Sequence, residues 1–145
     1  MLEWSDAERI LRTGRFLWLA TTSADGRPHL VQQWHVWVDG RLYFEGSERT
    51  LWARNLARDG RLGFGTQVGS RAAYGDATVD VIRGTPRDLA EKIARQYTAK
   101  YGRTFSYRPS AKQYESGHVF RATPSKLIVF DVKEFNTSAT RFTFG

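Results

Sequence analysis

The chain has 145 residues, no cysteine and a formal net charge of +7 at pH 7. This length corresponds to a single domain, over residues 1–145, that buries its core without disulfides or metals. The missing cysteines exclude disulfides, thiol nucleophiles, zinc fingers and iron–sulfur clusters. No apolar run approaches the ~18 residues of a membrane span, and the N-terminus lacks the basic-then-apolar order of a signal peptide. We therefore expect a cytoplasmic protein that does not act at a membrane.

Arginine and aromatic residues are unusually frequent. Of the 22 basic residues 17 are arginine, and aromatic side chains make up 14% of the chain. Arginine grips phosphates and carboxylates in a two-pronged fork, and aromatic rings offer flat faces for stacking. The composition suits an anionic, planar ligand, either a nucleotide-like cofactor or nucleic acid. It is equally typical of a basic surface over an aromatic β core.

The first half of the chain predicts a helix, three strands and a second helix. Ser5 and Glu8 have the spacing of a capping box, which predicts a short helix that ends at Gly14. Strands are expected at residues 16–22, 29–38 and 41–44, with Asp–Gly turns at 25–26 and 39–40. Leu51 and Leu56 give residues 47–58 helical spacing.

The second half predicts further strands around one clear helix. We expect a strand at 61–68, a loop at 69–75, a strand at 77–83, a helix that Asp88 caps, a long loop at 103–117, and strands at 118–123 and 127–132 split near Pro124. Short turns between strands make their neighbours antiparallel. The sequence thus predicts a mainly β fold, a small antiparallel barrel with peripheral helices, since closure removes exposed edges.

Residues 47–55 are the densest candidate for binding an anion. Ser47 and Thr50 lie near a predicted helix start, and Arg49 and Arg54 bracket it. Free N–H groups at a helix N-terminus, together with hydroxyls and arginines, form a phosphate site. The alternative is a solvated amphipathic helix on which Ser47 or Thr50 is merely a cap.

Other chemistry lacks support in the sequence. His29 and His35 are six residues apart on a predicted strand, about 20 Å, which is too far to bind one metal ion. No nucleophile-elbow, dinucleotide-binding or P-loop motif occurs. The aromatic residues of the 103–117 loop suit either a roof over a planar ring or packing in a dimer.

Several segments, taken in order, resemble the flavin-binding split-barrel family related to pyridoxamine 5′-phosphate oxidase. They are Phe16–Thr22, Asp25–His29, Trp34–Gly40, Leu42–Phe44, Ala53–Leu56 followed by Asp59–Arg61, and the strand end Gly84–Thr85. The Pro124–Lys126 step and the closing Ser138–Phe142 are similar to the actinobacterial branch that uses the deazaflavin coenzyme F(420). The likeness covers nearly the whole chain.

The resemblance implies a homodimer of six-stranded split barrels with a cofactor groove at the subunit interface. The cofactor is F(420) or FMN, and the activity is hydride transfer to or from a small organic substrate. The implied ring-binding residues are Val31, Gln32, Gln33 and Trp34. The implied phosphate-binding residues are Ser47, Arg49, Thr50, Trp52, Arg54 and Asn55.

Two positions depart from the family pattern. Trp52 stands where relatives carry a phosphate-binding lysine, and Gln32 stands where relatives often carry proline. If Trp52 fills the groove, its replacement by lysine should tighten phosphate binding about tenfold. Two other functions remain open: a non-catalytic carrier of a flavin, deazaflavin or haem, and a nucleic-acid binder. The scattered basic residues and the lack of a nucleic-acid-binding motif disfavour the second.

Overall fold

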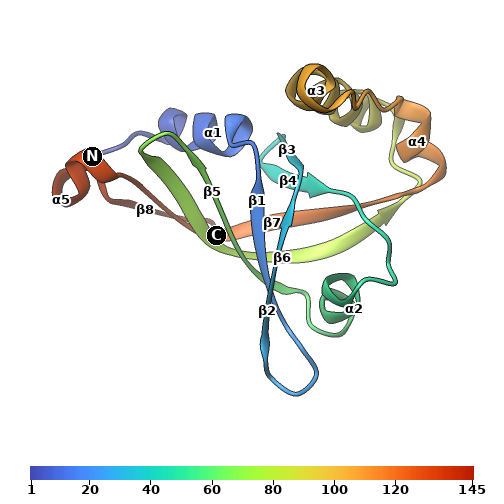
Figure 1. The fold of residues 1–145 in the computed structure, drawn as a ribbon, viewed down its shortest axis with the longest axis horizontal. Helices are drawn as coiled ribbons and strands as arrows, with labels where there is room; N and C mark the ends of the chain where they lie inside the picture. Colours follow the sequence, from blue (N-terminus) through green and yellow to red (C-terminus); the bar gives the residue numbers. More distant parts are fainter.

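One antiparallel sheet of eight strands forms the body of residues 1–145 in a computed structural model (Figure 1). Its order is β2-β1-β5-β6-β7-β4-β3, and β8 pairs with β7. The strands are β1 (Leu17–Thr22), β2 (Pro28–Gln33), β3 (His35–Val38), β4 (Arg41–Phe44), β5 (Arg61–Val68), β6 (Arg71–Arg83), β7 (His118–Asp131) and β8 (Thr140–Thr143). The sheet curls into a half-barrel, which confirms the predicted split-barrel class with peripheral helices.

Helices lie along the margins of this sheet (Figure 1). They are α1 (Trp4–Thr13), α2 (Leu51–Arg58), α3 (Arg87–Phe105), α4 (Ala111–Ser116) and α5 (Phe135–Ser138), with a 3-10 turn at Val132–Glu134. Helix α1 begins before the predicted cap at Ser5. Glu3 is its N-cap, and the backbone N–H of Glu3 donates to the Asp6 carboxylate at 2.8 Å. No helix is both long and apolar enough to cross a membrane.

The predicted strand over 29–38 is two strands. β2 pairs with β1, whereas β3 pairs with β4, and Trp34 separates them. The Trp34 ring stacks on Tyr101 of α3 with centroids 4.9 Å apart. This division, together with β8 near the C-terminus, gives eight strands, so the predicted count of six is not confirmed.

The two longest strands were predicted too short. β6 includes most of the predicted 69–75 loop, and β7 runs without interruption past Pro124. A register shift after Asp76 leaves Ser125 as an extra residue between Pro124 and Lys126, so the ladder accommodates a proline that lacks an N–H. Gly75 pairs with Leu127 within this ladder, and the position requires glycine because a Cβ there would overlap the backbone of Lys126.

The predicted 103–117 loop is largely helical. Helix α3 continues to Phe105, and α4 occupies residues 111–116. Tyr114 of α4 is fully buried and stacks on Tyr97 of α3, with centroids 6.3 Å apart. Contact between two aromatic side chains far apart in the sequence therefore orders a segment that shows no periodicity of its own.

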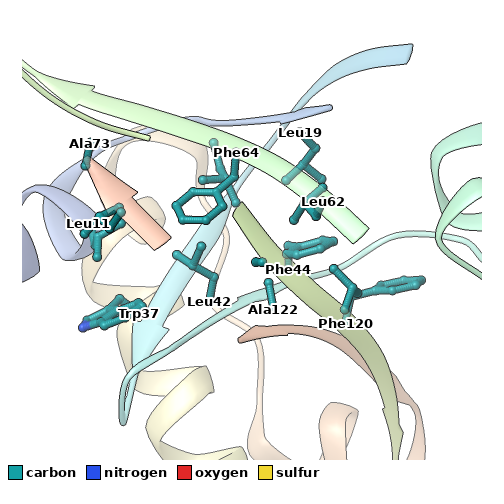
Figure 2. Close-up of a cluster of buried hydrophobic side chains, with 14 of the residues drawn as sticks. Leu11, Leu19, Trp37, Leu42, Phe44, Leu62, Phe64, Ala73, Phe120 and Ala122 are labelled. Carbon is teal, nitrogen blue, oxygen red and sulfur yellow. The ribbon is translucent and has the colours of Figure 1, made fainter. Parts of the chain in front are cut away.

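Two hydrophobic clusters hold the fold together. The first fills the half-barrel; it includes Leu19, Leu42, Phe44, Phe64 and Phe120, which face one another in Figure 2. Every second residue of β1 is buried, because successive side chains of a strand point to opposite faces of the sheet. The second cluster packs α3 and α4 against β3 and β4 through the buried tyrosines Tyr43, Tyr97, Tyr101 and Tyr114. The candidate site lies where these two clusters meet.

Candidate cofactor site

The chain between β4 and α2 carries the predicted phosphate-binding residues. Thr50 is the N-cap of α2, and its hydroxyl accepts from the Ala53 N–H at 3.4 Å. The Ser47 hydroxyl accepts from the Arg49 N–H at 3.1 Å. Both hydroxyls therefore stabilise the turn into the helix, as the alternative interpretation of this segment predicted. That role does not exclude binding an anion, because each hydroxyl oxygen has further hydrogen-bonding capacity.

The start of α2 nevertheless has backbone N–H groups that form no hydrogen bond within the chain. The N–H groups of Leu51 and Trp52 donate to no group in the chain. Arg49 and Arg54 are exposed, and neither makes an ion pair or a side-chain hydrogen bond. Free helix N–H groups beside unpaired guanidinium groups suit a phosphate.

Two of the predicted phosphate-binding residues point into the protein. Trp52 is 4% exposed and packs against Phe44 and Phe120, with centroid distances of 5.7 and 4.8 Å. Asn55 is 2% exposed, and its amide donates to the Thr21 hydroxyl at 3.1 Å. The structure thus gives both residues a packing role, and their contact with a cofactor stays a prediction.

Gln32, Gln33 and Trp34 line one cavity of about 290 Å³ with Glu45, Gly46, Tyr97 and Tyr107. Gln33 connects this cavity to the core. In the orientation that satisfies its neighbours, its amide donates to the Glu45 carbonyl at 3.2 Å and accepts from Trp52 Nε1 at 3.3 Å. The fourth predicted ring-binding residue, Val31, is half-buried and packs against the barrel core instead.

Aromatic rings form one wall of this cavity. Trp34 stacks on Tyr101 and on Phe105, whose centroid is 4.6 Å away, and Tyr107 lies 5.8 Å from Trp34. The Tyr97 hydroxyl donates to the Tyr43 carbonyl at 3.3 Å. Residues of the predicted 103–117 loop therefore meet the predicted ring-binding strand, and the cavity offers flat apolar surface beside amide groups.

Glu45 is a carboxylate in this cavity that makes no ion pair. It accepts hydrogen bonds from the Tyr107 hydroxyl at 2.7 Å and from Gln113 Nε2 at 2.8 Å. Burial raises the pKa of Glu45 above its usual value, and the hydrogen bonds from Tyr107 and Gln113 oppose that shift. The group therefore holds a proton more readily than an exposed glutamate.

A second cavity, of about 400 Å³, lies on the outer face of the sheet and adjoins the first. Gln32 lines both cavities. The outer cavity also includes Trp18 and Tyr74, which are 47% and 43% exposed. Large apolar side chains are thus exposed next to the candidate site. Together the two cavities provide more room for a planar ring than either alone.

Sequence and fold comparisons identify the family. Residues 5–133 match the family described as pyridoxamine 5′-phosphate oxidase. The match covers most of the chain, so this protein belongs to that family, as the order of its segments indicated. No curated protein matches the chain.

Solved structures with the same fold differ in function. An F(420) reductase is 17% identical, with 88% of this chain and 98% of that chain covered and a TM-score of 0.64. HutZ, the haem storage protein of Vibrio cholerae, is 17% identical, with 99% and 95% covered and a TM-score of 0.62. A pyridoxamine 5′-phosphate oxidase-related, FMN-binding protein of Nostoc punctiforme is 11% identical, with 97% and 92% covered and a TM-score of 0.60. At these identities the likeness shows the fold.

Several residues that line or support the cavity have no recognisable pattern in the sequence. Glu45 follows a strand without any motif, and Tyr97 has the spacing of an ordinary core residue. Tyr107 and Gln113 meet Glu45 only because the buried tyrosine cluster packs α3 and α4 against β3 and β4. Residue spacing alone does not reveal such contacts.

Proposed function

We propose that this protein is an oxidoreductase that transfers a hydride between bound F(420) or FMN and a small organic substrate. One observation carries the proposal: three of the four predicted ring-binding residues line one cavity together with Gly46, the residue directly before the predicted phosphate segment. Gln32, Gln33 and Trp34 meet Gly46 there, directly before Ser47. Family membership and the fold shared with an F(420) reductase and an FMN-binding protein support the same conclusion.

Each part of the site has a distinct role in this proposal. The cofactor ring lies against Gln32, Gln33 and Trp34, and its phosphate lies at the start of α2, between Arg49 and Arg54. The cofactor supplies the hydride chemistry, and the protein supplies position and electrostatics. Glu45, which burial makes easier to protonate, and the Tyr107 hydroxyl that donates to it hold a proton beside the ring.

A second copy of the chain completes the groove in this proposal. The outer face of the sheet exposes Trp18, Tyr74 and Leu30, the last at 63%, and its cavity reaches the candidate site through Gln32. We expect a homodimer that buries well over ~1,000 Å². Light scattering should report twice the mass of one chain; a monomer at working concentrations would remove the second wall of the site.

Anaerobic mixing tests the oxidoreductase proposal. The cofactor-free protein is mixed with reduced F(420) or reduced FMN, and a panel of organic acceptors is added. We expect one cofactor to bind at micromolar concentrations and its oxidation to accelerate with an acceptor only when the protein is present. The Arg49→Ala variant should need more cofactor for the same rate. If neither cofactor binds, the proposal is wrong.

The alternative is a carrier that binds a flavin, deazaflavin or haem without catalysis. Its support is the fold shared with the haem storage protein HutZ. Haem added to the same preparation gives an absorption shift if it binds at a defined site. Stoichiometric haem binding without cofactor oxidation would favour the carrier over the enzyme. The cytoplasmic location stays a prediction under either function.

A further inference from the structure

A separate cavity of about 350 Å³ lies between the C-terminal end of α1 and the middle of α3, which adjoin at the top of Figure 1. It is lined by Arg12, Thr13, Arg15, Gln96, Ala99 and Lys100. None of these residues lines the cavity of Gln33 and Trp34, although Arg15 also lines the outer cavity. Its volume falls at the lower end of the ~300–1,000 Å³ typical of small-molecule sites.

The charged residues of this cavity are all cationic. Arg12, Arg15 and Lys100 line it, and no carboxylate does. None of the three makes an ion pair anywhere in the chain. Like charges close together repel one another most where water is partly excluded. An anion from solution would relieve that repulsion.

Lys100 is the most buried of the three cations. Its Nζ donates to the His35 carbonyl at 2.8 Å. Burial first, and the charge of Arg15 second, lower the pKa of Lys100 to about 7. Its amine is therefore protonated only part of the time at neutral pH, and a bound anion would draw a proton onto it.

The neighbouring histidine supplies no counter-charge. The Leu11 carbonyl accepts from His35 Nε2 at 2.8 Å, which fixes the proton on Nε2. Burial and the nearby Lys100 lower the pKa of His35 to about 3, so the imidazole is neutral. No carboxylate of the chain makes an ion pair with Lys100; the groups that face its Nζ include the His35 carbonyl and the Tyr101 ring, whose centroid is 5.4 Å away.

The polar groups of the cavity suit a tetrahedral oxyanion. The Thr104 hydroxyl accepts from Arg15 Nη1 at 2.8 Å, which restrains that guanidinium group. Arginine binds phosphate oxygens in pairs, and lysine adds a point charge. We propose that this cavity binds the phosphoryl group of a small phosphate monoester through Arg12, Arg15 and Lys100. Three cations match the two negative charges of a phosphate monoester better than they match the single charge of a carboxylate. The cavity also has room for the organic group attached to the phosphate.

Calorimetric titration of the full chain, without cofactor, tests the site. The probes are glycerol 3-phosphate and inorganic phosphate. We expect saturable binding that is tighter for the monoester, weakened at least tenfold by Arg12→Gln and by Arg15→Gln. Arg95→Gln is the matched control, since Arg95 is exposed on α3, unpaired and outside the cavity. Equal or tighter binding of inorganic phosphate would contradict the proposal that the ligand is a phosphate monoester.

Two further outcomes would overturn the site itself. One is the absence of saturable binding. The other is a loss of affinity in Arg54→Gln as large as that in Arg15→Gln, which would place the anion at α2. The measurement involves no turnover. It therefore succeeds or fails independently of the proposed oxidoreductase function.

A second titration isolates the part that Lys100 plays. Sulfate keeps two negative charges near pH 7, so any proton taken up on binding comes to the protein. Titrations in two buffers of different ionisation enthalpy measure that uptake. We expect uptake in the wild type, and binding without uptake in Lys100→Arg, whose guanidinium is always charged. No uptake in the wild type, or equal uptake in Lys100→Arg, would exclude Lys100 from the site.

Discussion

The candidate cofactor cavity and the α1–α3 cavity each contain a buried ionisable side chain, an acid in the first and a base in the second. Burial favours the neutral form of both. It raises the pKa of Glu45 in the cofactor cavity and lowers the pKa of Lys100 in the α1–α3 cavity. Their neighbours differ. Glu45 accepts hydrogen bonds from neutral donors, whereas Lys100 has Arg15 as a cationic neighbour. In the first cavity, groups of the chain itself hydrogen-bond to Glu45, and aromatic rings form a wall. In the second, the cations have no anionic partner in the chain, so we expect an anion from solution to bind there.

The largest expected effect is in the core next to the candidate cofactor cavity. Trp52→Lys removes a buried ring and places a charge in the core, so we expect a loss of about 3–5 kcal/mol in the free energy of unfolding. Leu51→Lys is the matched control on the exposed side of α2, with an expected change within ~0.5 kcal/mol. Denaturant unfolding measures both. A stable Trp52→Lys protein with about tenfold tighter cofactor binding would instead support the role that the family pattern gives this position.

The next largest effect concerns the free arginines of α2. Arg49→Ala and Arg54→Ala should each weaken binding of F(420) or FMN by about 1.5–3 kcal/mol, as expected for a charge-assisted hydrogen bond. Stability should not change, because both side chains are exposed and unpaired. Arg103→Ala removes an equally exposed arginine far along α3 as a control. Unchanged affinity in both α2 variants would leave this segment as a solvated helix.

A pH titration of stability tests the cationic cavity. Because the folded pKa of Lys100 is about 7 and its ordinary value is 10.5, the wild type should gain stability as pH rises between them, relative to Lys100→Met. One fully displaced proton gives a slope of about 1.4 kcal/mol per pH unit, and solvent at the half-buried amine reduces it. Lys92→Met, which removes an exposed lysine, should show no such slope. Parallel curves for wild type and Lys100→Met would mean that Lys100 is not desolvated.

The smallest expected effect is the pH dependence of stability that Glu45 causes, and its sign is opposite to that expected for Lys100. A folded pKa above the ordinary 4.5 means that the wild type should lose stability, relative to Glu45→Gln, as pH rises through this value. Glutamine keeps an acceptor for the Tyr107 hydroxyl, so the difference isolates the charge. Glu48→Gln should show the reverse trend, because the Arg83 guanidinium holds the pKa of Glu48 below its usual value. The same trend in both variants would contradict the contrast between them.

Local patterns predicted the barrel strands well. Asp–Gly turns and alternating apolar residues located β1, β4 and β5, and residues 47–58 contain α2 as expected. Patterns failed where a distant contact decides the structure. Gly75 suggested a loop, but it is a strand residue of β6 whose lack of a side chain lets β7 pass close by. The α1–α3 cavity unites Arg12 and Lys100, two residues that no motif connects.

The order of the segments predicted part of the candidate cavity, and its contact with a cofactor stays a prediction. The resemblance named Gln32, Gln33 and Trp34, which line one cavity with Gly46, the residue directly before the predicted phosphate segment. It did not reveal that the Trp52 ring is buried in the core against Phe44 and Phe120, because a sequence does not state which way a side chain of α2 points. Nor did it reveal Glu45, whose partners Tyr107 and Gln113 come from a segment that showed no periodicity.

A crystal structure with bound F(420) or FMN tests the central claim most directly. We predict the ring against Gln32, Gln33 and Trp34, and the phosphate at the start of α2 within hydrogen-bonding distance of Arg49 or Arg54. A second copy of the chain should close the groove from the side of Trp18. A cofactor phosphate found instead among Arg12, Arg15 and Lys100, with the ring away from Trp34, would contradict the assignment of the two cavities.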